Sequence, residues 1–241
     1  QQFKATLEGV GQGSVISPTL LNLTLRGLEA AIFAATKPKD KVHAVFYADD
    51  FIVTGATREI LESTVKPLII SFLKERGLEL SEEKTLITNI NSGFDFLGHN
   101  VRKYKQKLLI KPAKKSIKAF LQNIRRVIKA RATAKTEDLI RVLNPKIRGW
   151  TNFYRHVVSK AIFSQVDHEI FKAIWKWARR RHPKKSWKWV YKKYFCRINH
   201  ENWVFNAGLQ ASQGRYHLLR LFSASSVPIK RHIKVRSAAT P

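Results

Sequence analysis

The sequence predicts an α+β protein in which a mainly antiparallel sheet backed by helices is followed by a helical region and a small basic module. Two short apolar runs, at residues 42–46 and 51–53, predict neighbouring strands, because apolar side chains alternate in the first run and Gly55 follows the second. After Pro112 the apolar period becomes helical. From about His182 onward, lysines and aromatic residues are interleaved.

The predicted sheet and its helices occupy residues 1–111. Ser17 can cap a helix whose first position is Pro18, since proline lacks the amide that would be unpaired there. A further helix is predicted over residues 57–76, with Pro67 kinking or limiting it and Gly77 at its C-terminal cap. The remaining predicted strands are residues 85–90, 94–101 and 107–110.

Three helices are predicted between residues 112 and 181, with apolar stripes that fit a three-helix core. Thr136 begins the second helix, where Glu137 and Asp138 lie near the positive end of the helix dipole. Trp150 and Tyr154 lie one turn apart on that helix, and core packing is favoured over base stacking for both. The apolar stripes of the first and third helices are Ile117, Phe120, Leu121, Ile124, Val127, Ile128, and Phe163, Val166, Ile170, Ile174, Trp177.

Charge is distributed unevenly along the chain. Its 45 Lys and Arg residues against 17 Asp and Glu residues give a formal net charge of +28. Residues 1–100 carry 10 basic and 12 acidic side chains, whereas residues 101–241 carry 35 basic and 5 acidic ones. A basic surface of this size favours a phosphate backbone as partner over an unpartnered solvated surface, whose self-repulsion would destabilise the protein.

Other features of the composition exclude whole classes of protein. The single cysteine, Cys196, rules out a disulfide framework and a zinc site built from cysteine pairs within this chain. No apolar run is long enough to span a bilayer, so no membrane partner is expected.

Paired carboxylates stand between the first two predicted strands. Asp49 and Asp50 repel one another and are costly to bury, and a divalent metal is the usual reason for such a pair. Two metal ions can stabilise the attacking and leaving oxygens of a phosphoryl transfer. An ordinary Asp-Asp turn is the alternative, because aspartate is common in turns.

The segment YADDF at residues 47–51 resembles the catalytic hairpin of reverse transcriptases. Other segments resemble the same family in the same order: QGSVISP (12–18) before the hairpin, GLELSEEKT (77–85) after it, FDFLG (94–98) as the primer grip, and NPKIRGW (144–150) with NFY (152–154) as the thumb of intron maturases. Together they identify the chain by resemblance as a group II intron-encoded reverse transcriptase/maturase.

The resemblance implies a partial reverse-transcriptase palm at residues 1–111, a helical thumb or maturase domain at 112–181 and a basic DNA-binding region at 182–241. It implies a two-metal Mg²⁺ site in which Asp49 and Asp50 are the catalytic metal ligands. The implied nucleotide-binding residues are Gln12, Gly13, Tyr47, Ala48 and Lys84, and the implied primer grip is Phe96, Leu97 and Gly98. For Lys84, a surface ion pair with Glu82 or Glu83 is the alternative.

The resemblance also implies contacts with nucleic acid outside the palm. The implied partners are group II intron RNA, target DNA and the template–primer duplex. Trp187 and Tyr191 could stack on bases, dock on the thumb, or do both. The expected RNA-binding residues are Lys114, Lys115, Lys118, Arg125, Arg126, Lys146, Arg148 and Arg155, and the expected DNA-binding residues are Lys184, Lys185, Lys188, Lys192 and Lys193.

Two departures from the family pattern bear on function. In the family, an earlier palm motif supplies another metal-binding aspartate, and we expect it to lie outside this sequence. Gly11 replaces the usual proline before Gln12 and loosens the backbone there. We expect an RNA-directed DNA polymerase and maturase that acts in the bacterial cytoplasm, or in an organelle, and serves intron splicing and mobility. A splicing maturase with a relic palm is the alternative, and a reverse transcriptase of another lineage is less compatible with the thumb sequence.

Overall fold

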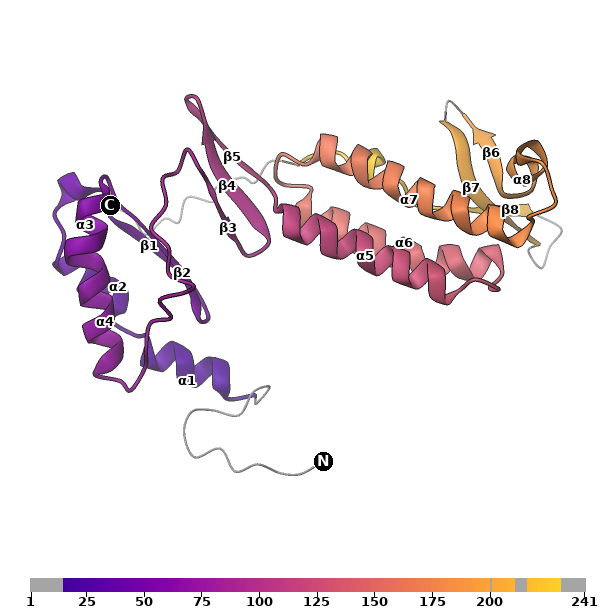
Figure 1. Ribbon diagram of the computed structural model, residues 1–241. Helices are drawn as coiled ribbons and strands as arrows, with labels where there is room; N and C mark the ends of the chain where they lie inside the picture. The colour runs from indigo at the N-terminus through magenta and orange to yellow at the C-terminus, as the bar shows by residue number, and fades with distance from the viewer. Residues whose placement is uncertain (1–14, 200, 211–215, 231–241) are drawn as a thin grey trace. The chain divides into compact units, whose positions relative to one another are not determined.

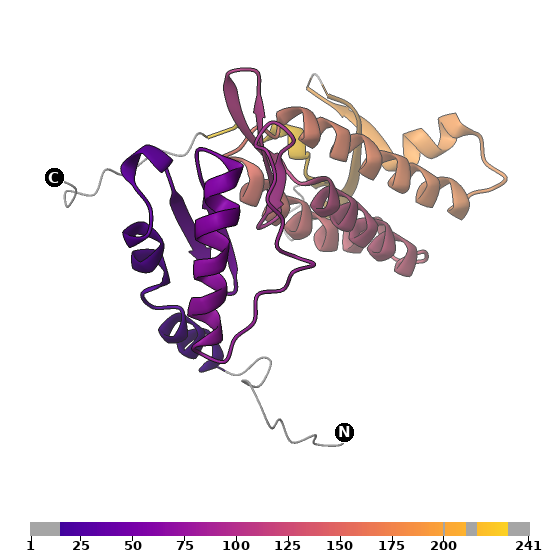
Figure 2. The same ribbon diagram turned by 60° about the vertical axis from the view of Figure 1, so that its left-hand side comes forward.

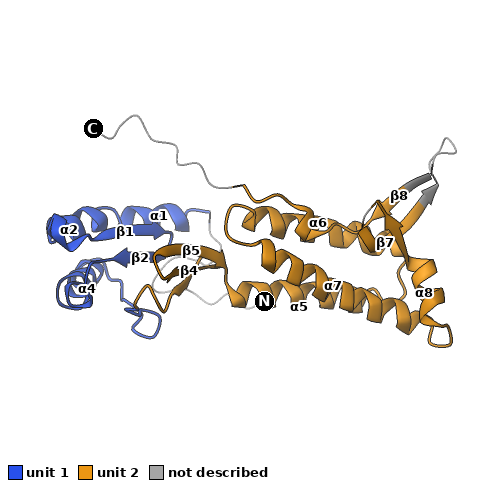
Figure 3. Cartoon of the chain, turned by 90° about the horizontal axis from the view of Figure 1, so that it is seen from above, with its two compact units in different colours: residues 1–88 blue, residues 89–241 orange. Residues whose placement is uncertain are grey.

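The computed structural model describes residues 15–199, 201–210 and 216–230, and it divides into two compact units. Residues 1–88 form the first unit and residues 89–241 the second (Figure 3). The predicted segment around Gln12 and Gly13 lies outside the described residues. Both units combine helices with small antiparallel sheets, so the α+β class is confirmed.

The first unit packs helices on one face of a two-stranded hairpin (Figures 1 and 2). Strands β1 and β2 pair in antiparallel register, and Leu28 and Ile32 of α2, Val65 of η2, and Ile69 and Leu73 of α4 contribute to its buried core. In chain order the elements are α1 (Ser17–Thr24), α2 (Leu28–Ala34), the 3₁₀ turn η1 (Pro38–Asp40), β1 (His43–Tyr47), β2 (Asp50–Thr54), α3 (Arg58–Ile60), the π-helical turn η2 (Leu61–Val65) and α4 (Lys66–Lys74).

Pro67 is accommodated without ending the helix. A π-helical turn immediately precedes it, in which the amide of Lys66 bonds to the carbonyl of Leu61. The helix ends in a Schellman-type cap, because Gly77 has φ +67° and the amide of Leu78 bonds to the Leu73 carbonyl at 2.9 Å. The predicted cap at Gly77 is therefore confirmed.

Two predictions for this region were wrong. Helix α1 begins at Ser17 itself, after an Ile16 that provides no side-chain cap, so Ser17 is not the cap. Residues 85–90 form no strand. Leu86 is 80% exposed, and although the Lys103 amide donates to the Ile90 carbonyl at 2.9 Å, no described strand forms a ladder with this segment.

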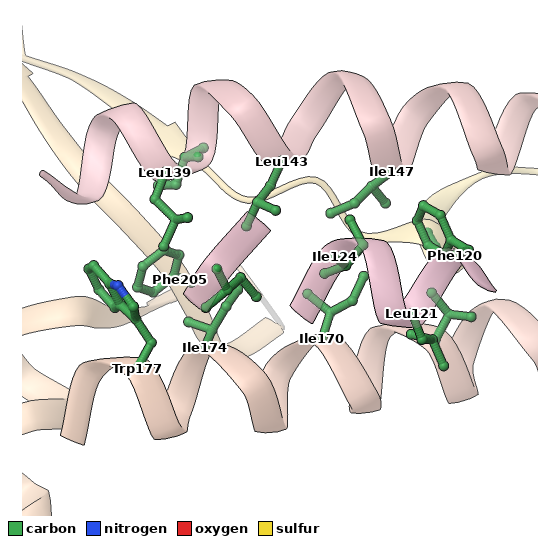
Figure 4. Close-up of a cluster of buried hydrophobic side chains, with 14 of the residues drawn as sticks. Phe120, Leu121, Ile124, Leu139, Leu143, Ile147, Ile170, Ile174, Trp177 and Phe205 are labelled. Carbon is green, nitrogen blue, oxygen red and sulfur yellow. The ribbon is translucent and has the colours of Figure 1, made fainter. Parts of the chain in front are cut away.

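The second unit begins with a three-stranded antiparallel sheet in the order β3-β4-β5 and continues into three long helices. These elements are β3 (Phe94–Phe96), β4 (His99–Tyr104), β5 (Lys107–Pro112), α5 (Lys114–Ala130), α6 (Thr136–Tyr154) and α7 (Lys160–Arg181). The apolar stripes predicted from the sequence meet between the three helices, where Ile124, Leu143 and Ile174 are fully buried (Figure 4). Tyr154 is 3% exposed, which confirms core packing for this ring.

A small module covers the far end of the bundle. It consists of α8 (Trp187–Tyr194) and a second three-stranded antiparallel sheet, β6 (Phe195–Ile198), β7 (Glu201–Gln210) and β8 (Tyr216–Arg220), followed by the 3₁₀ turn η3 (Ala224–Ser226). Val190, Tyr194 and Phe205 of this module belong to the same buried cluster as the bundle. Among the described helices, none is both long and apolar enough to cross a membrane.

The chain then returns from the small sheet to the bundle as residues 221–230, which we call the return segment. The side-chain amide of Asn144 donates to the Arg220 carbonyl at 3.0 Å and accepts from the Phe222 amide at 2.8 Å. Asp167 accepts from the amides of Ala224 and Ser225 at 2.7 and 2.8 Å. No structural role was predicted for either residue, although Asn144 begins the NPKIRGW segment and precedes the helix-interior Pro145.

Replacing Asn144 with alanine should loosen the return segment without unfolding the bundle. Two hydrogen bonds to backbone are lost, which costs about 1–3 kcal/mol. In Asn144→Ala we expect amide hydrogen exchange in residues 221–227 to be faster than in the wild-type protein, and exchange in α7 to change less. Asn152→Ala is the matched control, because Asn152 is exposed on the same helix and its side chain has no hydrogen bond within the described chain. Equal exchange in both variants would contradict a clamping role for Asn144.

Candidate functional site

The paired carboxylates lie at the tip of the β1–β2 hairpin. Because Tyr47 pairs with Asp50, the two turn residues are Ala48 and Asp49. Ala48 has φ +51° and Asp49 does not have a positive φ, which is the pattern of a type II′ hairpin turn. A left-handed alanine costs about 1–2 kcal/mol, so this tight turn stores strain beside the carboxylates.

Strand alternation separates the two faces of the hairpin. Phe46 and Phe51 are cross-strand partners whose ring centroids lie 5.6 Å apart, and both pack against the core of the first unit. Tyr47 and Asp50 therefore project to the opposite face, where Tyr47 is 62% exposed. The core thus fixes the orientation of the hairpin while its tip stays accessible.

Asp49 and Asp50 are both exposed, and neither carboxylate has a hydrogen bond or ion pair within the described residues, although the Asp50 backbone pairs with Tyr47. Their oxygens are hard acceptors without a cation partner, and this donor set suits Mg²⁺, which binds through one or two carboxylates plus phosphates and water. No cluster of three or more His, Cys, Asp or Glu side chains occurs in the described part of the chain, so the pair supplies only part of a coordination sphere.

The predicted primer grip forms a second tight hairpin, in the second unit. Leu97 (φ +47°) and Gly98 (φ +79°) are the two turn residues between the paired Phe96 and His99, and consecutive positive φ values are typical of a type I′ turn. The Gly98 carbonyl accepts hydrogen bonds from the Tyr154 hydroxyl and from the Ala113 amide, each at 2.9 Å. The turn is therefore tied to the start of α5 and the end of α6.

Gly98 is a position where a side chain is poorly tolerated. A Cβ there would lie 2.9 Å from the Tyr154 hydroxyl, in a backbone conformation that L-residues avoid. Gly98→Ala should lower the free energy of unfolding by about 2 kcal/mol. Gly149→Ala is the matched control, because a Cβ there meets nothing within 4 Å in the interior of α6, and it should stabilise by about 0.5–1 kcal/mol. Urea unfolding of both variants measures the difference, and equal effects would contradict the argument.

The basic residues of α5 form one continuous stripe. At about 100° per residue, the five predicted RNA-binding positions on this helix fall within about 120° of its circumference, beside the buried face. All are exposed, but Arg125 is engaged by Glu169 of α7 at 2.6 Å, and Arg126 donates to Asn123. The positions are Lys114, Lys115, Lys118, Arg125 and Arg126.

The Glu169 carboxylate joins this basic surface to α7. Hydrogen bonding to Lys172 at 3.0 Å, and secondarily to Arg125, lowers the pKa of Glu169. Removing Arg125 should change stability little, because exposed ion pairs contribute little.

The three predicted positions on α6 are not brought together. Lys146, Arg148 and Arg155 are exposed, yet helical geometry places Lys146 on the opposite side of α6 from the other two. The Arg148 guanidinium lies 5.1 Å from the ring centroid of Phe222, so it also contacts the return segment.

The remaining predicted cations are exposed. Lys84 lies in a turn of the first unit and forms no ion pair with Glu82 or Glu83 in the described structure. Lys184 and Lys185 precede α8, and Lys188, Lys192 and Lys193 lie on it. Trp187 is 49% exposed, whereas Tyr191 is half-buried against the bundle core, so α8 both docks on the bundle and leaves an aromatic ring accessible.

His182, which precedes α8, contacts two side chains of that helix. His182 Nε2 and the Tyr194 hydroxyl lie 2.8 Å apart, and the His182 ring meets Trp189 edge-on at 4.7 Å. Desolvation, and then the charges of Lys193, Arg181 and Lys185, lower the pKa of His182. The imidazole is therefore neutral at physiological pH.

An acidic hairpin in the first unit and a basic three-helix bundle in the second are the parts of a reverse transcriptase joined to a maturase domain. Residues 1–101 match the family described as reverse transcriptase (RNA-dependent DNA polymerase), and residues 117–195 match the group II intron, maturase-specific domain. The chain belongs to the group II intron reverse transcriptase/maturase family. The reverse-transcriptase family uses divalent metal ions.

Two curated relatives are similar to parts of this chain. Protein YkfC of Escherichia coli (strain K12) is 31% identical over 41% of this chain and 34% of its own length. The ribosomal operon-associated A protein of Euglena longa is 30% identical over 53% of this chain and 25% of its own length. The chain thus spans about a third of one relative and a quarter of the other.

Proposed function

We propose that this protein is an RNA-directed DNA polymerase and maturase that binds intron RNA, promotes its splicing and supports intron mobility by target-primed reverse transcription. The observation that carries the proposal is the strained two-residue turn that presents Asp49 and Asp50 side by side without a cation partner. The basic stripe on α5 is an independent reason to expect a nucleic-acid partner.

In this proposal, Asp49 and Asp50 hold the catalytic Mg²⁺ ions, which neutralise charge on the reacting phosphates when bound. Tyr47 and Ala48 lie beside the primer end and the incoming nucleotide, together with Gln12 and Gly13. Lys84 is free of ion pairs in the described chain and binds the phosphates that leave. These residues act by positioning and by charge, since the protein supplies no covalent chemistry in phosphoryl transfer.

We further propose three functional regions: a palm at residues 1–111, a thumb at 112–181 and a DNA-binding region at 182–241. Phe96, Leu97 and Gly98 hold the primer, and their hairpin is anchored to α5 and α6 through Gly98. The exposed cations of α5 and α6 bind RNA, and those around α8 bind DNA. Action in the bacterial cytoplasm is proposed, with an organelle as the alternative, because the relatives include a bacterial protein and one from a euglenid.

The test is Mg²⁺-dependent extension of a DNA primer on an RNA template by the complete natural polypeptide. Extension that disappears with Asp49→Ala supports the polymerase and the metal site together. Tight binding of intron RNA without any extension would contradict the polymerase and favour a maturase with a relic palm, for which Gly11 is the sequence observation.

A further inference from the structure

Strand β7 contains a bulge that changes the direction of one large aromatic side chain. Ile198 pairs with Glu201 and Cys196 pairs with Val204, so Asn202 and Trp203 together stand opposite the single residue Arg197. Trp203 has φ +62°, a conformation that bulky residues rarely adopt. Bulges of this kind re-aim side chains, and strain that persists needs support from the surrounding structure.

The support is a group of aromatic rings contributed by α7, α8 and β6. Tyr191 meets Trp203 at 4.5 Å between ring centroids in a T-shaped contact, and Trp175 meets it at 5.5 Å. Trp187 lies nearly parallel to Trp203, at 6.4 Å and 17°. The rings of Tyr191 and Trp175 therefore support Trp203, which remains 38% exposed. Trp187 beside it is 49% exposed.

Cations border these two exposed rings. Residues 182–210 carry six Lys and Arg side chains and one acidic side chain, Glu201. On α8, Lys188 and Lys192 share one helix face directly beside the face of Trp187 and Tyr191. The Lys188 Nζ lies 5.9 Å from the Trp187 ring centroid. The surface thus combines rings that accept a flat apolar group with charges that accept its phosphates.

We propose that Trp187 and Trp203 form a stacking platform for an unpaired base of single-stranded nucleic acid, with Lys188 and Lys192 on the adjoining phosphates. The inference rests on the proposed nucleic-acid-binding function of this region. Base stacking on aromatics is sequence-tolerant, and backbone charge contacts are salt-dependent, so the two contributions can be measured separately.

The same helix offers a matched control. Trp189 is 37% exposed, an exposed fraction similar to that of Trp203. It lies on the other side of α8, however, where its ring meets His182 and lies near Lys185 and Lys193. Trp189→Ala therefore removes an exposed tryptophan of the same helix without touching the platform. Trp187 has one ring contact in the described structure, to Trp203, so Trp187→Ala should leave the fold intact, as circular dichroism can verify.

The experiment measures binding of the full chain to oligo(U) and oligo(dT) of about 12 nucleotides as salt is varied. Trp187→Ala should weaken binding by roughly 5- to 150-fold, the range for one base–aromatic stack, with the salt slope unchanged. Trp187→Phe should recover most of the affinity, and Trp189→Ala should change it less than about two-fold. Lys188→Gln should instead reduce the salt slope by about 0.7.

Each outcome decides the proposal. Abasic oligonucleotides should bind wild type and Trp187→Ala equally, because the lost contact is to a base. A loss confined to oligo(U) assigns the platform to RNA, and one confined to oligo(dT) assigns it to DNA. Unchanged affinity in Trp187→Ala, with a reduced slope in Lys188→Gln, overturns the platform but leaves nucleic-acid binding standing. Failure of wild type to bind either oligonucleotide overturns both.

Discussion

Replacing Asp49 with alanine should reduce DNA synthesis by the complete polypeptide at least about 10³-fold, while affinity for intron RNA stays nearly unchanged. The metal ions that Asp49 is proposed to hold contribute several kcal/mol to transition-state stabilisation. RNA affinity should be retained because the exposed basic side chains that we assign to RNA belong to α5 and α6 of the second unit.

Glu79→Ala is the matched control for this change. Glu79 is an exposed carboxylate of the same unit and has no ion pair within the described residues, so its removal alters net charge equally without touching the hairpin. Single-nucleotide incorporation and RNA binding should be measured on the same preparations. A large loss of RNA affinity in Asp49→Ala would show that the carboxylate pair serves another purpose.

Neutralising Lys114, Lys115 and Lys118 together should weaken RNA binding and lower its salt slope by about 2–3 units. Each lysine that neutralises one phosphate contributes about 0.7–0.9 to that slope. The three side chains share one exposed face of α5 and have no ion pairs within the described residues. Glutamine substitutions keep the helix, so affinity titrations at several salt concentrations report charge alone.

The control is a triple glutamine variant at Lys39, Lys41 and Lys74, three exposed lysines of the first unit. It changes net charge by the same amount, so long-range attraction to RNA falls equally in both variants. Only contacts made by α5 can separate them. If both variants lower the slope to the same extent, the RNA footprint is not on α5.

Sequence periodicity predicted the helical bundle well because its signal is local and repeated. Ile124 and Ile174 occupy the core that the spacing in the first and third helices predicts. The hairpin at Asp49 follows from two short apolar runs, but four residues separate those runs, and only the structure shows that pairing of Tyr47 with Asp50 reduces the turn to two residues. Roles assigned to individual cations are harder to derive, since Arg125 and Lys118 have the same helical phase but only Arg125 meets Glu169, which lies 44 residues away.

Apart from the helix start at Ser17, which is a local matter, the errors and omissions share a physical cause, which is pairing between distant segments. Residues 85–90 have a strand-like pattern and lack a partner strand in the described structure. The left-handed backbone at Trp203 depends on the register of β6 against β7, which a one-residue bulge changes. Asn144 looks like a helix-interior residue before a proline, and only the returning chain 76–78 residues later gives its side chain partners.

The return segment also has a consequence for folding during synthesis. The Asp167 carboxylate can accept hydrogen bonds from the amides of Ala224 and Ser225 only after these residues, 57 and 58 positions further along the chain, have been synthesised. At about 5–20 residues per second, roughly 3–12 seconds pass between translation of the acceptor and of its donors. During that interval the surface of α6 and α7 that later covers Ala224 is open to water. Chain closure over this long loop is therefore a late, non-local step.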